Sequence, residues 1–120
     1  MPRVAVVTEG RSGLDDVVAQ RFGRAPTITI VDLGADGGIA GIRIIENPGA
    51  SASGGAAVKT VQVLVKEGVD LVVGPSFGPN AQAILVEMNI RSLVVGPGTK
   101  VRDALAAALK ELGIPGNLHG

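Results

Sequence analysis

The sequence predicts an α/β fold in which short strands alternate with amphipathic helices. In the first half of the chain, β-branched runs bounded by glycine, proline and aspartate are typical of strands. In the second half, apolar residues recur at three- and four-residue spacing, which indicates helices buried on one face. The pentapeptide Leu-Val-Val-Gly-Pro occurs at 71–75 and again at 93–97, each time between two predicted helices. Such strand–helix–strand units imply parallel strands joined by right-handed crossovers.

The first half of the chain predicts three strands. Arg3–Thr8 is a β-branched run of the kind that is buried on both faces of a sheet. Thr27–Leu33 alternates, with Ile28 and Ile30 on one face, and a glycine- and aspartate-rich turn follows it. The chain then returns along Ile39–Glu46, so the second and third strands are predicted to be antiparallel neighbours.

The second half predicts three helices and two strands. The first helix starts near Gly54, Pro79 opens the second in its first turn, and Thr99 is the predicted N-cap of the third. The two strands are 71–73 and 92–95. Each helix is predicted to end in a residue that tolerates positive φ, followed by an apolar residue. The three pairs are Gly68-Val69, Asn89-Ile90 and Gly113-Ile114.

These elements combine into a five-stranded mixed sheet in the order 3-2-1-4-5, flanked by helices. Only the second strand runs against the others, and this is the ribonuclease H-like arrangement. Residues 1–115 are expected to form a single domain. Residues 116–120 are expected to be a flexible tail, which carries the only histidine, His119.

Composition argues against several classes of protein. Eleven basic and eleven acidic residues give no formal net charge, and only two residues are aromatic, whereas a nucleic-acid binder needs a basic excess. With no cysteine, the chain has neither disulfides nor thiolate metal sites. Apolar runs are all shorter than the roughly 18 residues of a membrane span, and no secretory signal is recognisable. We therefore expect a cytoplasmic protein with no membrane or nucleic-acid partner.

Catalytic motifs are missing as well. A ribonuclease H-type nuclease needs carboxylates gathered at the centre of the sheet to hold two metal ions, but the first strand has none before Glu9. The sequence contains no phosphate-binding loop of the G-x-x-x-x-G-K-[ST] type and no pairing of a nucleophile with a base. A non-enzymatic role is predicted.

The topology indicates where a ligand would bind. Strands one, three, four and five point the same way, so the loops that follow them gather at one edge of the sheet, where open α/β folds bind ligands. These loops, all rich in glycine, serine or proline, are 9–13, 47–55, 74–78 and 96–99. Three lead into helix N-termini, which favour anions. Lys59, Lys100 and Arg102 lie near those first turns, either to meet an anion or simply as solvated side chains.

Three segments resemble a known family. They are Val4-Ala5-Val6 with Gly13-Leu14-Asp15, then Phe22-Gly23-Arg24-Ala25-Pro26, and finally Asn47-Pro48 with the later Gly78-Pro79-Asn80-Ala81. In this order and spacing they resemble the dinitrogenase iron–molybdenum cofactor biosynthesis family, the NifX/NifB C-terminal-like domains. The resemblance extends from Val4 to about Leu112. It implies a ribonuclease H-like fold and a role in carrying or binding metal–sulfur clusters.

The same resemblance indicates a binding cleft. Members often have a histidine before Phe-Gly-Arg and another after Asn-Pro, where this chain has Arg21 and Gly49. Without cysteine or a cleft histidine, an iron–molybdenum or other metal–sulfur cluster, or an oxyanion, would be held by cations, hydroxyls and backbone amides. No catalytic or metal-ligating residue is predicted. The predicted cofactor-binding residues are Arg21, Arg24, Asn47, Ser51, Ser53, Lys59, Gly78 and Asn80.

Other roles stay open for these residues and for the whole chain. Arg24 is as well suited to pairing with a surface carboxylate, Phe22 to the core, and Asn80 to satisfying the first turn of its helix. The alternative function is a protein–protein interaction or regulatory module that has lost the family's ligand, with a protein as its partner. The sequence leaves the oligomeric state and the identity of the ligand open.

Overall fold

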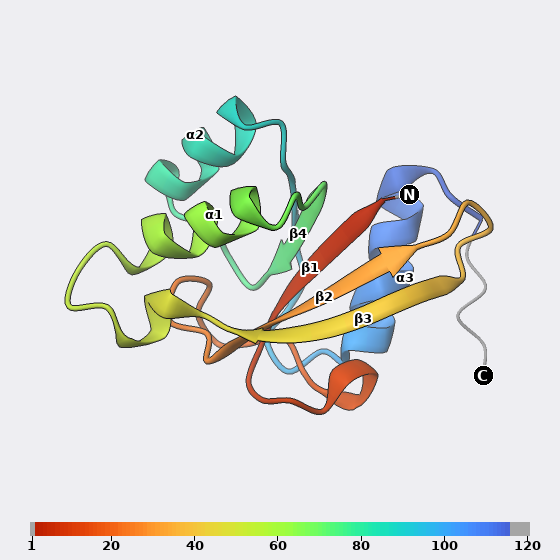
Figure 1. Cartoon of the computed structure of the whole chain (residues 1–120), viewed down its shortest axis with the longest axis horizontal. Coiled ribbons are helices and arrows are strands. Elements are labelled where there is room, and N and C mark those ends of the chain that lie inside the picture. Colours follow the sequence, from red (N-terminus) through yellow and green to blue (C-terminus); the bar gives the residue numbers. More distant parts are fainter. Residues whose placement is uncertain (1, 116–120) are drawn as a thin grey trace.

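The centre of the molecule is a five-stranded sheet in the order β3-β2-β1-β4-β5 (Figure 1). The computed structural model describes residues 2–115, so the predicted tail 116–120, with His119, lies outside the described residues. The strands are β1 (Arg3–Thr8), β2 (Thr27–Leu33), β3 (Ile39–Glu46), β4 (Leu71–Gly74) and β5 (Arg91–Val94). The helices are α1 (Ala56–Lys66), α2 (Pro79–Glu87) and α3 (Val101–Leu112), with 3₁₀ turns η1 (Gly13–Asp15) and η2 (Pro48–Ser51).

The strand order and directions confirm the predicted mixed sheet. β1 pairs antiparallel with β2 and parallel with β4, so that Val6 lies beside Thr29 on one side and Val73 on the other. β2 pairs antiparallel with β3, and β4 pairs parallel with β5. Four strands therefore point the same way, and β2 alone runs against them.

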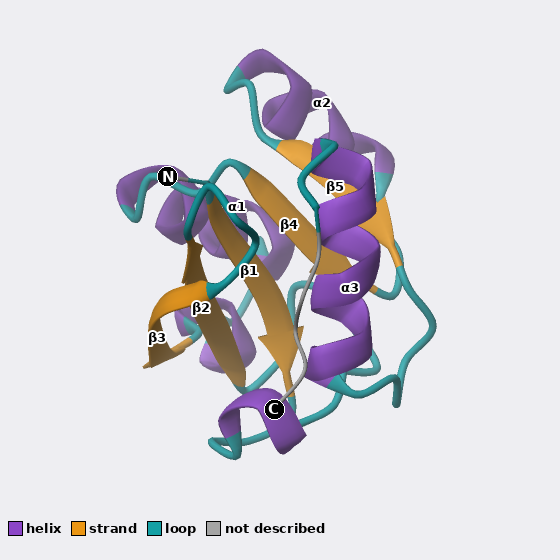
Figure 2. Ribbon diagram, turned by 90° about the vertical axis from the view of Figure 1, so that its right-hand side faces the viewer, coloured by secondary structure: helices purple, strands orange, loops and turns teal. Residues whose placement is uncertain are grey.

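Helices cover both faces of the sheet, with α1 and α2 on one face and α3 on the other (Figure 2). Alternation along β1 supplies both interfaces, because Ala5 and Val7 pack toward α1 and α2 while Val4 and Val6 pack toward α3. All four side chains are fully buried. β1 is thus the strand buried on both faces that its β-branched sequence predicts.

The helix ends are the predicted left-handed caps. Gly68, Asn89 and Gly113 have φ angles of 68°, 59° and 70°. In each case the next residue donates its N–H to a carbonyl five residues earlier, as from Val69 to Leu64 at 3.1 Å. This bond is the mark of a Schellman motif, and it sends the chain back toward the sheet.

The predicted N-cap of α3 is wrong by one residue. Lys100, not Thr99, occupies the cap position, and no side chain caps this helix. The cause is tertiary: the Thr99 carbonyl accepts from Val18 N–H at 2.8 Å, and Val17 bridges Lys100. Because this segment pairs with the chain after η1, helical geometry starts only at Val101.

The last two strands differ slightly from their predicted bounds. β4 ends one residue later than predicted, and β5 begins and ends one residue earlier.

An ion-pair network ties elements together where β1 begins, at the edge away from the predicted ligand loops. Arg3 Nε donates to Asp32 of β2 at 2.6 Å, and Arg3 Nη1 donates to the carbonyl of Glu67, which caps α1. The backbone N–H of Arg3 donates to Asp70 at 2.8 Å, just before β4. One arginine thus joins two strands and a helix end, a role that no local pattern predicts.

Asp32→Asn should make stability less sensitive to acid. Hydrogen bonding and charge from Arg3 hold the pKa of Asp32 below its ordinary value. A depressed folded-state pKa contributes stability above the unfolded-state pKa, and this contribution is lost as pH falls through the folded value. The variant should be less stable at pH 7 and should lose less stability on acidification, measured by urea unfolding at several pH values. Asp36→Asn, in the exposed hairpin, is the control and should retain the wild-type pH profile.

Candidate functional site

The loops that follow β1, β3, β4 and β5 meet in two groups at one edge of the sheet. On the α3 side, the chain at 16–18 pairs with 98–101. On the α1 and α2 side, the segment 22–24 packs against the turn after β3 and the start of α1. Phe22 also meets Phe77, in the loop after β4, with ring centroids 5.0 Å apart. The second group contains most of the predicted site residues.

Asn47 is the centre of this second group. Its side chain is buried, and its Nδ2 donates to the carbonyls of Ala25 at 3.0 Å and Gly23 at 3.4 Å. Its Oδ1 accepts from the N–H of Gly49 and from the hydroxyl of Thr60, both at 3.0 Å. These bonds use the full hydrogen-bonding capacity of the amide. The side chain of Asn47 therefore joins three segments of the protein and has no group left for a ligand.

Two glycines allow these segments to approach so closely. A Cβ built on Gly49 would lie 2.5 Å from the oxygens of Ala56, Gly23 and Thr60. A Cβ on Gly23 would lie 2.7 Å from the backbone nitrogen of Ala57. Neither position has room for a side chain, so a histidine in place of Gly49 would not fit this backbone. We call Gly23, Asn47, Gly49 and Thr60 the Asn47 cluster. Sequence reasoning missed its structural role.

Arg24 interacts with carbonyl groups. Its Nη1 donates to Ala52 at 2.6 Å and, more weakly, to Gly49 at 3.4 Å. Among residues 2–115 it makes no ion pair, so the alternative in which Arg24 pairs with a surface carboxylate is wrong. The residue is nevertheless exposed, and its Nη2 and Nε donate to no described protein group. Arg24 thus holds the loop with one nitrogen and directs charge toward solvent with the others.

The remaining predicted residues lie on the surface around this cluster. Arg21, Ser51 and Ser53 are exposed, as are Gly78 and Asn80 at the start of α2. Phe22, by contrast, is 5 % exposed and belongs to the core, which confirms that alternative. The structure therefore brings Arg24 and the turn containing Ser51 into contact. It leaves Gly78 and Asn80 on a neighbouring helix start.

Lys59 is the least central of the predicted residues. It is exposed, whereas the next residues along α1, Thr60 and Val61, are buried against the sheet. At 100° per residue, its side chain leaves the helix about 100° around from that of Thr60, on the flank of the Asn47 cluster. Lys59 belongs to the first turn of α1, the end of the helix that lies at this edge.

Both helices on this side begin without side-chain caps. α1 starts after Gly55, whose φ is 65°, and α2 starts after Gly78 with Pro79 in its first turn. The first N–H groups of each helix therefore lack a capping side chain and point toward this edge. Oriented N–H groups of this kind attract anions. Within the described chain, no group of three or more His, Cys, Asp or Glu is placed to hold a metal ion.

Comparison with known proteins decides the family. A model of the family described as "Dinitrogenase iron-molybdenum cofactor" matches residues 2–111. The chain belongs to this family. The matched range contains the Phe-Gly-Arg and Asn-Pro segments, whose side chains and glycines build the Asn47 cluster.

Solved structures agree with this assignment. The apo form of the orange protein from Desulfovibrio gigas is 31% identical, with a TM-score of 0.81 over 98% of this chain and 93% of that one. A putative NifB protein from Thermotoga is 31% identical, with a TM-score of 0.71 over 92% and 89% of the two chains. The protein PH0822, at 20% identity and a TM-score of 0.74 over 91% of each chain, shares the fold. No curated protein matches the chain significantly.

None of the described helices is long and apolar enough to cross a membrane.

Gly49→Ala should destabilise the protein, because the added methyl group would overlap three oxygens that belong to different segments. We expect the free energy of unfolding to fall by about 1–3 kcal/mol, the usual cost of overpacking. Urea unfolding followed by circular dichroism measures the change. Gly54→Ala, five residues later and with open space around its Cβ, is the matched control and should change stability by less than about 0.5 kcal/mol. Equal effects at the two glycines would contradict the close approach at Gly49.

Proposed function

We propose that the protein is a small non-catalytic carrier for an anionic metal–sulfur cluster or an oxyanion. The observation that carries this proposal is the pair of helix starts, α1 and α2, which direct uncapped N–H groups toward the edge where Arg24 is exposed. Membership of a family described by the iron–molybdenum cofactor supports a cluster as the cargo. The likeness to an orange protein solved in its apo form supports it further.

The available donors decide how such a cargo would be held. The chain has no thiolate, and the residues near the edge offer guanidinium, hydroxyl, amide and backbone N–H groups. These groups donate hydrogen bonds to the sulfur or oxygen atoms of an anion, whereas direct bonds to iron would fall to oxygen ligands that suit hard cations better. The cargo would therefore be bound from outside, through its surface atoms.

Each predicted residue takes a different part in this proposal. Arg21, Arg24 and Lys59 supply positive charge, and Ser51, Ser53 and Asn80 supply neutral hydrogen bonds. Gly78 leaves the backbone at the start of α2 accessible. Asn47 acts indirectly, since its buried amide holds the loop that carries the serines.

The expected affinity is modest. Hydrogen bonds to a charged group contribute about 1.5–3 kcal/mol each. Three of them sum to roughly 5–9 kcal/mol, whereas a micromolar dissociation constant corresponds to about 8 kcal/mol. Weak and reversible binding suits a protein that receives a cargo and passes it on.

Three further parts of the proposal concern the protein as a whole. We assign the sheet to the ribonuclease H-like type on the basis of its strand order and directions. We also propose that residues 1–115 form one domain and that the protein works in the cytoplasm.

Titration calorimetry with molybdate, tetrathiomolybdate and phosphate tests the carrier function. We expect at least one of these anions to bind the wild-type protein, and Arg21→Ala to weaken binding by about tenfold through loss of one charge-assisted hydrogen bond. Lys110→Ala, a charge change on the exposed side of α3, should bind as the wild type does. Absence of both heat and a thermal shift with all three anions would leave the chain without the proposed cargo.

A further inference from the structure

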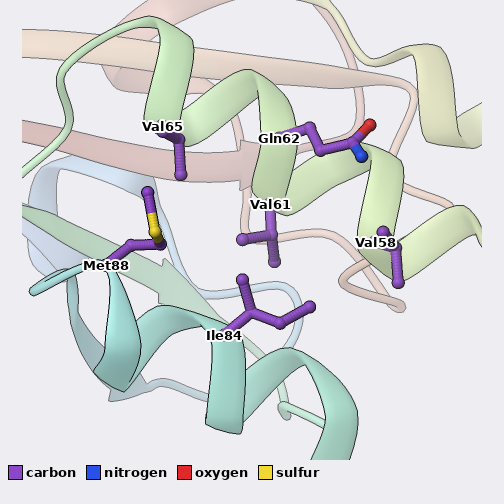
Figure 3. Close-up of a pocket in the computed structure, with 6 residues that line it drawn as sticks. All are labelled: Val58, Val61, Gln62, Val65, Ile84 and Met88. Atoms are coloured by element: carbon purple, nitrogen blue, oxygen red, sulfur yellow. The ribbon is translucent and has the colours of Figure 1, made fainter.

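An apolar groove of about 260 Å³ separates α1 from α2 on the outer side of the helix layer. Figure 3 shows the valines of α1 on one side of the groove, with Ile84 of α2 and Met88, the residue after α2, on the other. The lining residues are Val58, Val61, Gln62, Val65, Ile84 and Met88. Met88 is 46% exposed. None of these residues belongs to the predicted binding site, so the groove requires an explanation of its own.

Charged residues lie along the two helices that border the groove. On α1, Lys59 and Lys66 share an outer stripe with Gln62, because helix positions three, four and seven apart face the same way. On α2, Glu87 lies three residues after Ile84 and next to Met88. Lys66 and Glu87 are exposed, and neither makes an ion pair within residues 2–115. Where the two helices end, the groove therefore has a basic residue on one side and an acidic residue on the other.

The direction of the helices places these charges at matching ends. Both helices lead from the edge with the ligand loops back toward the opposite edge, so they run side by side in the same direction (Figures 1 and 3). Lys66 ends α1 and Glu87 ends α2. The two opposite charges thus lie at the same level on either side of the apolar groove.

We propose that this face is a self-complementary interface covered by a second copy of the chain. A two-fold axis parallel to the helices lays α1 of each copy on α2 of the other. Lys66 then faces Glu87 of the second copy, and the symmetry repeats this pair. The groove residues of both copies then form the apolar centre between the two pairs of helices.

The charges also select this axis over the alternative one. A two-fold axis across the helices would lay α1 on α1 in the opposite direction, with Lys66 facing Lys59 of the second copy. Like charges in contact disfavour that arrangement. The same two charges disfavour a partner that is uniformly acidic or uniformly basic at this point, because either Glu87 or Lys66 would repel it.

The interface is small. α1 and α2 have 11 and 9 residues, which correspond to about 16 and 14 Å of helix. Two such helices cover less than the about 800 Å² per partner of a standard stable interface. We therefore expect a dimer that forms and dissociates with protein concentration.

Sedimentation equilibrium of the full chain tests this dimer. Between about 10 μM and about 1 mM, a range suited to small interfaces, the average mass should rise from 12.0 kDa toward twice that value. Met88→Lys puts a charge into the groove at a half-exposed position and should abolish the rise. Lys110→Glu, on the opposite face of the sheet, is the control and should associate as the wild type does. A monomer mass at every concentration would overturn the proposal, whatever the anion titrations show.

A charge exchange tests the arrangement within the dimer. Lys66→Glu and Glu87→Lys should each weaken association by about fivefold, because each replaces two attractive pairs with two repulsive ones. The double variant restores opposite charges across the interface and should return association to near the wild-type level. A double variant that is weaker than both single variants would overturn the proposed axis.

Discussion

The buried amide of Asn47 is the interaction on which the rest of this edge depends. It joins the end of β3 to the Phe-Gly-Arg segment through two carbonyls, and it joins the following turn to α1 through Thr60. A buried amide with all its hydrogen bonds made stabilises the fold, whereas loss of any one partner would leave a polar group desolvated. The position of the loop, and hence of every exposed donor on it, follows from these four bonds.

Glycine and arginine stabilise the two edges of the sheet by different means. Where the strands end, Gly23 and Gly49 let backbones approach too closely for any side chain. Where β1 begins, Arg3 spans the gap between elements with its long side chain and binds Asp32 and the end of α1. The first edge is tightly packed beneath exposed polar loops, which suits ligand binding by backbone groups. The second edge is an ion-pair network whose strength depends on pH.

The two proposals concern neighbouring surfaces of the same helix layer, and Lys59 lies where they meet. Anion binding uses the starts of α1 and α2, and self-association uses the groove between them together with Lys66 and Glu87 near their ends. A parallel dimer would leave the helix starts of both copies on the same side. The two anion sites would then face in the same direction, and both could be open while the dimer is formed.

The sequence by itself determined the strands, the helices and their order, because each of these features depends on periodicity or on a neighbouring residue. Gly68, Asn89 and Gly113 end their helices as predicted, since a left-handed cap depends on the residue at that position and the one after it. Only the tertiary structure decided what Asn47, Arg24 and Thr99 do. Several of their partners lie far away along the chain, as Ala52 does from Arg24 and Val18 from Thr99, and no local pattern encodes a contact that exists only after the sheet has formed.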